Sequence, residues 1–184
     1  LYEKEGRSLI YYQMLGLSLL ELGKTKEFTD LILKISKHKY SELTHQKKYL
    51  TLLSLFKAQK YKDVVDGFEA LNNSTILTNN SGTRRVLSDV FYYWRARAFL
   101  EMGEYQNALN ETFRFRPVNN QASVGYILDH YWPKKDYIKG LAYEGLEDEI
   151  NARRSYQDFL SVWSNADNSL PEVVDAKQKL ENLR

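Results

Sequence analysis

The sequence has 184 residues and no cysteine, which excludes disulfide bonds, thiolate nucleophiles and cysteine-ligated zinc or iron–sulfur sites. With 26 basic and 24 acidic residues, the net charge of +2 is too small to indicate a chain that binds mainly to nucleic-acid backbones. Proline and glycine are scarce, at 3 and 9 residues, and this scarcity of helix breakers predicts a mostly helical chain.

Four segments in chain order share one pattern, in which an apolar-periodic helix stops at a short polar turn and a second helix follows. They align on small or apolar residues that lie 36, 44 and 44 residues apart, at Gly16, Leu52, Ala96 and Gly140. The pattern predicts four helical hairpins, over about residues 9–40, 45–73, 84–117 and 133–166. A small side chain lets two helices cross closely, and we expect Tyr92 and Tyr156 to seal the crossings at Ala96 and Gly140.

The turn of each hairpin follows the small position at a constant distance. Gly23 and Gly103 occupy the turn in the first and third hairpins, where glycine most easily adopts a positive φ. Gln59 and Glu147 stand there in the second and fourth hairpins. We therefore expect these two turns to be less strictly formed.

Polar connectors separate the hairpins. Residues 72–83 and 116–123 are rich in asparagine and serine and predict loops. The last segment, residues 170–184, has Pro171 near its start and apolar residues at helical spacing with charges between them. We expect one amphipathic helix there, which caps the end of the array.

The hairpins resemble the tetratricopeptide repeat, a unit of about 34 residues with an aromatic, a leucine and a small residue in its first helix, then an alanine and an aromatic in its second. The third hairpin matches through Tyr92, Ala96, Phe99, Gly103, Tyr105 and Ala108, and the fourth through Gly140, Tyr143, Ala152 and Tyr156. The resemblance implies an all-α fold, a right-handed α-solenoid of such hairpins with a C-terminal capping helix, forming one domain over residues 1–184.

The last third of the chain, from residue 131 on, also resembles the segment that closes some bacterial tetratricopeptide proteins. In those proteins the N-terminal part is a signalling or regulatory module. The sequence starts without methionine and directly on helix-like residues. We therefore expect the chain to be part of a longer protein.

Residues that could support catalysis do not converge in the sequence. His38, His45 and His130 lack partner ligands at metal-binding spacing, and the acidic run 147–149 falls on a hairpin turn and helix start, where carboxylates are favourable. Neither a glycine-rich phosphate loop nor a GxSxG elbow occurs. We expect no enzymatic activity, no cofactor and no metal site.

Arginines next to aromatic residues are the best candidates for nucleic-acid binding. They occur at Arg95 and Arg97 within YYWRAR, and at Arg114 and Arg116 within FRFR. Acidic residues in the same helices balance their charge, so the release of counterions on binding is expected to be weak. We expect the arginine stems to lie over tyrosine faces and the heads to pair with carboxylates, which leaves nucleic acid as a distant alternative.

The tetratricopeptide resemblance also implies a concave groove lined by the first helices of successive hairpins. Its register selects Tyr49, Leu53, Phe56, Tyr93, Arg97, Leu100 and Tyr137 as partner-binding residues. Tyrosine offers a large face and a hydroxyl group at low entropic cost, which suits an extended peptide or a partner helix. The same tyrosines would also suit packing between repeats, and both interpretations stay open.

The sequence thus predicts a non-catalytic scaffold module that binds a protein or peptide partner in its groove. The alternative is a ligand-sensing or self-associating regulatory segment of a bacterial kinase, cyclase or transcription regulator. No segment approaches the roughly 18 consecutive apolar residues of a membrane span. The composition leaves the cellular compartment open.

Overall fold

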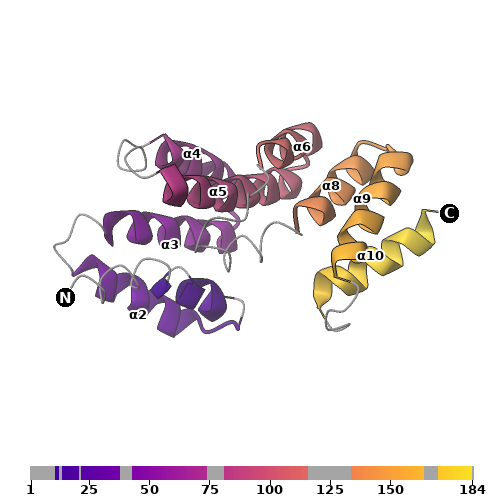
Figure 1. The fold of residues 1–184 in the computed structure, drawn as a ribbon. Coiled ribbons are helices and arrows are strands. Elements are labelled where there is room, and N and C mark those ends of the chain that lie inside the picture. Colours follow the sequence, from indigo (N-terminus) through magenta and orange to yellow (C-terminus); the bar gives the residue numbers. More distant parts are fainter. Residues whose placement is uncertain are drawn as a thin grey trace. The chain divides into compact units, whose positions relative to one another are not determined.

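The computed structural model describes seven ranges of the chain, residues 11–12, 14–20, 22–37, 43–73, 81–115, 134–163 and 170–183. All regular secondary structure in these ranges is helical (Figure 1), which confirms the prediction of an all-α fold. The chain divides into two compact units, Leu1–Gly67 and Phe68–Arg184, hereafter the first and second units. The boundary falls inside helix α4 (Tyr61–Asn72).

The first unit contains a helical segment at residues 14–20, then α2 (Thr25–Ser36), α3 (Leu43–Lys57) and the start of α4. Phe28, Leu31 and Ile35 recur at helical spacing and are the buried side of α2, which packs against α3. The side chain of Leu50 in α3 fills the space beside Gly16, so a Cβ atom at position 16 would overlap it. The first helix of hairpin one therefore also packs against α3.

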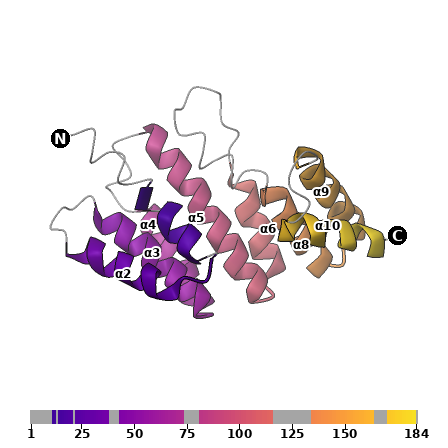
Figure 2. The same cartoon turned by 90° about the horizontal axis from the view of Figure 1, so that it is seen from below.

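The second unit contains the last residues of α4 and five further helices, α5 (Ser81–Glu101), α6 (Tyr105–Phe113), α8 (Lys134–Gly145), α9 (Glu149–Val162) and α10 (Pro171–Asn182). From α5 to α10 each labelled helix packs against the next, and α5 also contacts α8 (Figure 2). Phe68 of α4 lies against Phe91 of α5, with ring centres 5.4 Å apart. Within this unit, consecutive helices thus lie side by side.

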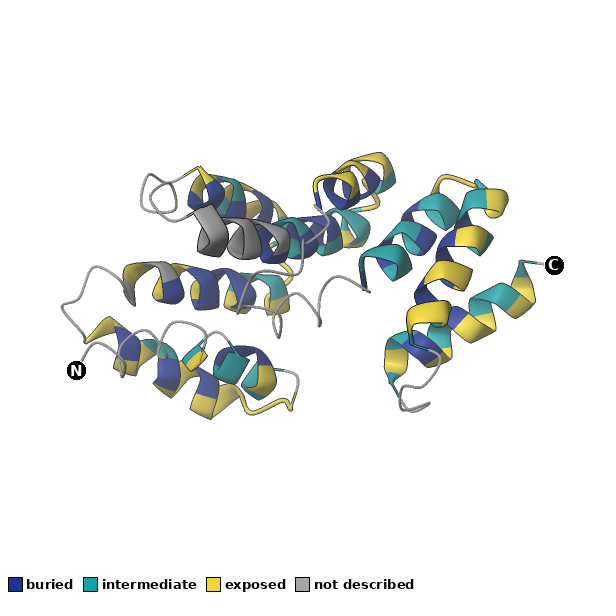
Figure 3. Cartoon of the chain, viewed as in Figure 1, coloured by how far each residue is buried: buried dark blue, intermediate teal, exposed yellow. Residues whose placement is uncertain are grey.

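Buried residues line the facing sides of the described helices of the second unit (Figure 3), and two of the clusters that they form are defined by their contacts. One joins α6 to α8 through Ala108, Leu109 and Ala142, and the other joins α9 to α10 through Ala152, Tyr156, Phe159, Val173 and Ala176. A Cβ atom at Gly140 would overlap the ring of Tyr156, which confirms the predicted close crossing in the fourth hairpin. At the equivalent position of the third hairpin, Ala96 is fully buried.

The four hairpin turns share one backbone conformation. A single residue in each turn has a positive φ: 69° at Gly23, 60° at Gln59, 73° at Gly103 and 59° at Glu147. The next residue donates its backbone N–H to a carbonyl of the preceding helix over 2.8 to 3.0 Å, in the pairs Lys24 to Leu19, Lys60 to Leu55, Glu104 to Phe99 and Asp148 to Tyr143. This pattern is the Schellman motif, which satisfies carbonyl groups at a helix end.

The expectation that the second and fourth turns are less strictly formed is wrong. Gln59 and Glu147 take the left-handed conformation although their Cβ atoms make it cost about 1–2 kcal/mol. Their own N–H groups donate to Phe56 and Glu144 over 3.0 Å each. The hydrogen bonds of the turn therefore impose the conformation whether or not glycine is present.

Helix α10 lies where the sequence predicts an amphipathic helix. Pro171 occupies its first turn, where the missing N–H group would have no helical acceptor. Val173 and Ala176 are buried against α9, whereas Lys177 and Gln178 are exposed. Among the described helices, none combines the length and the apolar character needed to cross a bilayer.

Candidate functional site

Three of the seven residues predicted to line a groove lie in the interior. The relative exposure is 2% for Tyr49, 1% for Leu53 and 4% for Tyr93. Side chains so deeply buried cannot present a face to a partner. For these three residues the packing interpretation holds, and their assignment as direct partner contacts is corrected accordingly.

Phe56, Leu100 and Tyr137 are half-buried. The ring centre of Phe56 lies 5.3 Å from that of Tyr61 within the first unit, and Leu100 packs against the cluster between α6 and α8. The ring of Tyr137 lies 5.3 Å from that of Phe159. A large part of each side chain is therefore used for packing, and only the remainder is open to solvent.

Arg97 differs from the other six because it carries a charge at a partly open position. Its Nη1 atom donates a hydrogen bond to the hydroxyl oxygen of Tyr93 over 3.2 Å. Burial acts to lower the pKa of the guanidinium, but Tyr93, Glu101 and Glu172 outweigh it and the pKa lies above its usual value. Arg97 is thus fully charged and held in a defined orientation on α5.

A seam of polar contacts joins α8 to α10 within the second unit. Lys134 Nζ lies 2.7 Å from Glu172 Oε1, and Lys179 Nζ lies 3.0 Å from Glu144 Oε2. Between them, the hydroxyl of Tyr137 donates to Asp175 Oδ2 over 2.7 Å. The partners follow the same order along both helices, so α10 runs parallel to α8.

The seam affects the titration of its members. Burial acts to raise the pKa of Glu172, but the contact with Lys134 outweighs it and holds the pKa below its usual value. Burial raises the pKa of Tyr137 above its usual range, and the hydrogen bond to Asp175 adds to the effect. Glu172 also contributes to the raised pKa of Arg97, so the charge on α5 is electrostatically coupled to the contacts between α8 and α10.

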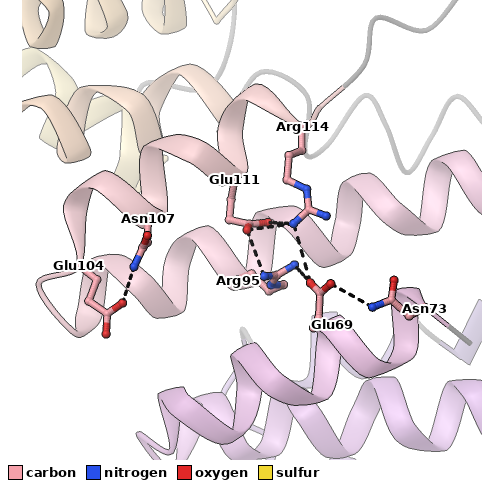
Figure 4. Close-up of polar contacts among 7 residues, drawn as sticks. All are labelled: Glu69, Asn73, Arg95, Glu104, Asn107, Glu111 and Arg114. Atoms are coloured by element: carbon pink, nitrogen blue, oxygen red, sulfur yellow. Dashed lines mark hydrogen bonds and ion pairs between the residues drawn. The ribbon is translucent and has the colours of Figure 1, made fainter.

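A second polar cluster is formed by Glu69, Arg95, Glu111 and Arg114 (Figure 4). Arg95 pairs through Nη1 with Glu69, and its Nη2 lies 3.1 Å from Glu111 Oε1. Arg114 Nη1 lies 3.2 Å from the same oxygen of Glu111. The side chains of Arg95 and Glu111 are 9% and 7% exposed, so two opposite charges are buried where α4, α5 and α6 meet.

The cluster bears on the nucleic-acid alternative. The guanidinium of Arg114 lies 4.5 Å from the ring centre of Tyr92, and its charge pairs with Glu111. The contacts of Arg95 and Arg114 agree with the expectation that arginine heads pair with carboxylates, and Arg114 also lies over a tyrosine face. Their charge is therefore compensated within the chain, while Arg116 lies outside the described residues.

Among the residues that the structure describes, no group of three or more acidic, histidine or cysteine side chains could hold a metal ion. His38 and His130 lie outside the described residues, as does the side chain of His45. Comparisons with protein-family models, with curated proteins and with solved structures found no match.

Proposed function

We propose that the chain is a non-catalytic protein-binding module built from tetratricopeptide-like hairpins stacked as a right-handed α-solenoid. The repeated turn supports this proposal, because the same Schellman motif recurs at residues 23, 59, 103 and 147 with the spacing of the small residues. The packing of successive helices in the second unit is also what a stack of hairpins requires. In repeat arrays of this kind, binding surfaces are built from the same helix of each repeat.

The observation that carries the proposed function is the state of Arg97. A charged guanidinium that is largely buried, reaches solvent only in part and is already oriented by Tyr93 loses little conformational entropy when it binds a partner. Arginine is one of the residue types enriched among the contacts that dominate protein interfaces. We propose Arg97 as the central contact on the face of the first helices, with Glu101 beside it.

The role of the other predicted groove residues follows from their burial. In the second unit, Leu100 and Tyr137 would contribute the edges that remain open to solvent, and Phe56 would do so separately in the first unit. Tyr93 would act as a positioning residue, since its hydroxyl orients Arg97. Tyr49 and Leu53 would pack in the interior behind α3 and make no contact with the partner.

A selection of phage-displayed peptides against the intact chain tests this proposal. Peptides enriched on the wild-type chain should lose binding by about tenfold or more on Arg97→Glu. They should keep binding to the control Arg154→Glu, which changes an exposed arginine on α9. Circular dichroism would verify that both variants are folded. Failure to enrich any peptide, or equal binding to all three proteins, would contradict the proposal.

A further inference from the structure

The buried charges of Glu69, Arg95, Glu111 and Arg114 play no part in the proposed binding face, and their arrangement is energetically poor. Among the described residues, the Nε atom of Arg95 has no hydrogen-bond acceptor although it is buried. Burial raises the pKa of Glu111, and the nearby Arg95 and Arg114 only partly oppose this rise. Apolar side chains of similar size often stabilise a protein more than such a buried group of charges does. Stability alone therefore does not explain the cluster.

The equivalent positions one repeat later also meet, but with different chemistry. The residues 44 positions after Glu69 and Arg95 are Phe113 and Lys139. Lys139 Nζ lies 5.6 Å from the ring centre of Phe113. The position equivalent to Glu111 is held by Ser155, which is buried and uncharged. The two successive junctions of the second unit thus use the same pair of positions for an ion pair and for a cation–π contact.

We propose that these positions form a pairing key, which makes α5 accept the last residues of α4 and makes α8 accept α6. At the first junction the last residues of α4 offer a carboxylate to an arginine of α5. At the second junction α6 offers an aromatic face to a lysine of α8. The key would act on the order of hairpins rather than on the stability of the stack.

Such a pairing key would prevent one specific kind of misfolding in repeat proteins. The hairpins share their turns and their close helix crossings, so a helix can dock on the wrong neighbour during folding. If α8 received the last residues of α4 in place of α5, Arg95 would lose Glu69. An incompletely paired guanidinium in a buried site carries a large penalty, which disfavours the wrong arrangement.

The test replaces the buried part of the key by apolar side chains in the intact chain. In Arg95→Met/Glu111→Met the exposed partners Glu69 and Arg114 remain, and they already lie 3.8 Å apart. We expect a urea unfolding midpoint equal to or higher than that of the wild type. We also expect the amide NMR signals of α5 and α6 to lose their single set and to split or broaden. The control Lys62→Gln/Asp66→Asn removes an exposed ion pair and should leave both measurements unchanged.

Two results would overturn the inference. A lower midpoint in both Arg95→Met/Glu111→Met and a second pair, Arg95→Leu/Glu111→Leu, would show that the cluster stabilises the fold. A single sharp set of signals in the more stable of the two pairs would show that the order of hairpins does not depend on the key. Neither result depends on peptide binding, so the proposed function is tested separately.

Discussion

Glu147 holds the same left-handed backbone conformation as Gly103, which lies 44 residues earlier, with φ of 59° and 73° respectively. In both turns the following residue donates its N–H group to the equivalent carbonyl oxygen over 2.9 Å. A residue with a Cβ atom in this conformation carries a conformational cost that glycine avoids. The turns of the second and fourth hairpins are therefore slightly strained, and this strain lowers the stability of the chain.

Replacing Glu147 by glycine should remove this backbone strain. We expect Glu147→Gly to raise the free energy of unfolding by about 0.5–1 kcal/mol, measured by urea denaturation. The matched change Gly103→Ala should lower it by a similar amount, because nothing lies within 4 Å of the added Cβ and only the backbone is strained. A loss of stability in Glu147→Gly would contradict the account of the turn.

The crossing of α8 and α9 should not tolerate a methyl group at position 140. Because a Cβ atom there overlaps the ring of Tyr156, we expect Gly140→Ala to lower the free energy of unfolding by about 1–3 kcal/mol. In a Tyr156→Ala background the same change should cost much less, since the ring is gone. Equal costs in the two backgrounds, measured by urea denaturation, would show that the overlap is relieved elsewhere.

Removing Arg95 alone should be far more damaging than removing Arg95 and Glu111 together. Arg95→Met leaves the buried Glu111 with Arg114 as its close partner, and we expect a loss of about 3–5 kcal/mol at neutral pH. Burial already raises the pKa of Glu111 in the wild type, so the folded chain retains a proton that the unfolded chain has lost. The free energy of unfolding therefore falls as the pH rises from the pKa of Glu111 in the unfolded chain to its higher pKa in the folded chain.

The pH dependence provides the check on that variant. Without Arg95 the pKa of Glu111 should rise further, so the loss in Arg95→Met should be smaller at about pH 5 than at neutral pH. Urea denaturation at the two pH values measures this difference. Arg154→Met, which changes an exposed arginine, should show little loss at either pH. A loss in Arg95→Met that does not change with pH would exclude Glu111 as the cause.

Alkaline conditions should weaken the second unit through two tyrosines. Burial raises the pKa of Tyr137 and Tyr156 above the usual range, and their hydrogen bonds to Asp175 and Glu144 add to the effect. An unfolded tyrosine ionises near pH 10, so this contribution is complete below about pH 10 and is lost as the pH rises further. Tyr137→Phe should reduce the slope of stability against pH in that range. An unchanged slope in urea denaturation would contradict the assignment.

The hairpins were predictable because their signals repeat along the chain. A period of 3.6 residues, a small or apolar residue at the aligned position and a turn at constant distance recur, so an error in one hairpin is corrected by the others. The conformation of Gln59 and Glu147 was mispredicted because the sequence shows the cost of a Cβ atom but not the hydrogen bonds that offset it. Residue type alone therefore underestimates how strongly a helix end constrains its turn.

The site was less predictable, because side-chain burial depends on the rotation of each helix about its axis. Tyrosine suits both a groove and a core, and the structure buries Tyr93 fully but Arg97 only in part. The sequence did contain a signal for the charge cluster. Arg95 follows Phe91 by four residues and Glu111 follows Ala108 by three, so both charges fall on the buried side of an apolar stripe.

Helix α10 has a consequence for the assembly of many copies. The uncovered end of a repeat array is a template on which another copy can add, and repeated addition produces fibres. The exposed residues of α10 include Pro171, Lys177, Gln178 and Glu181, with one apolar side chain, Val174, among them. If the helices of the second unit form a repeat stack, we expect this mostly polar side of α10 to disfavour the addition of another copy there.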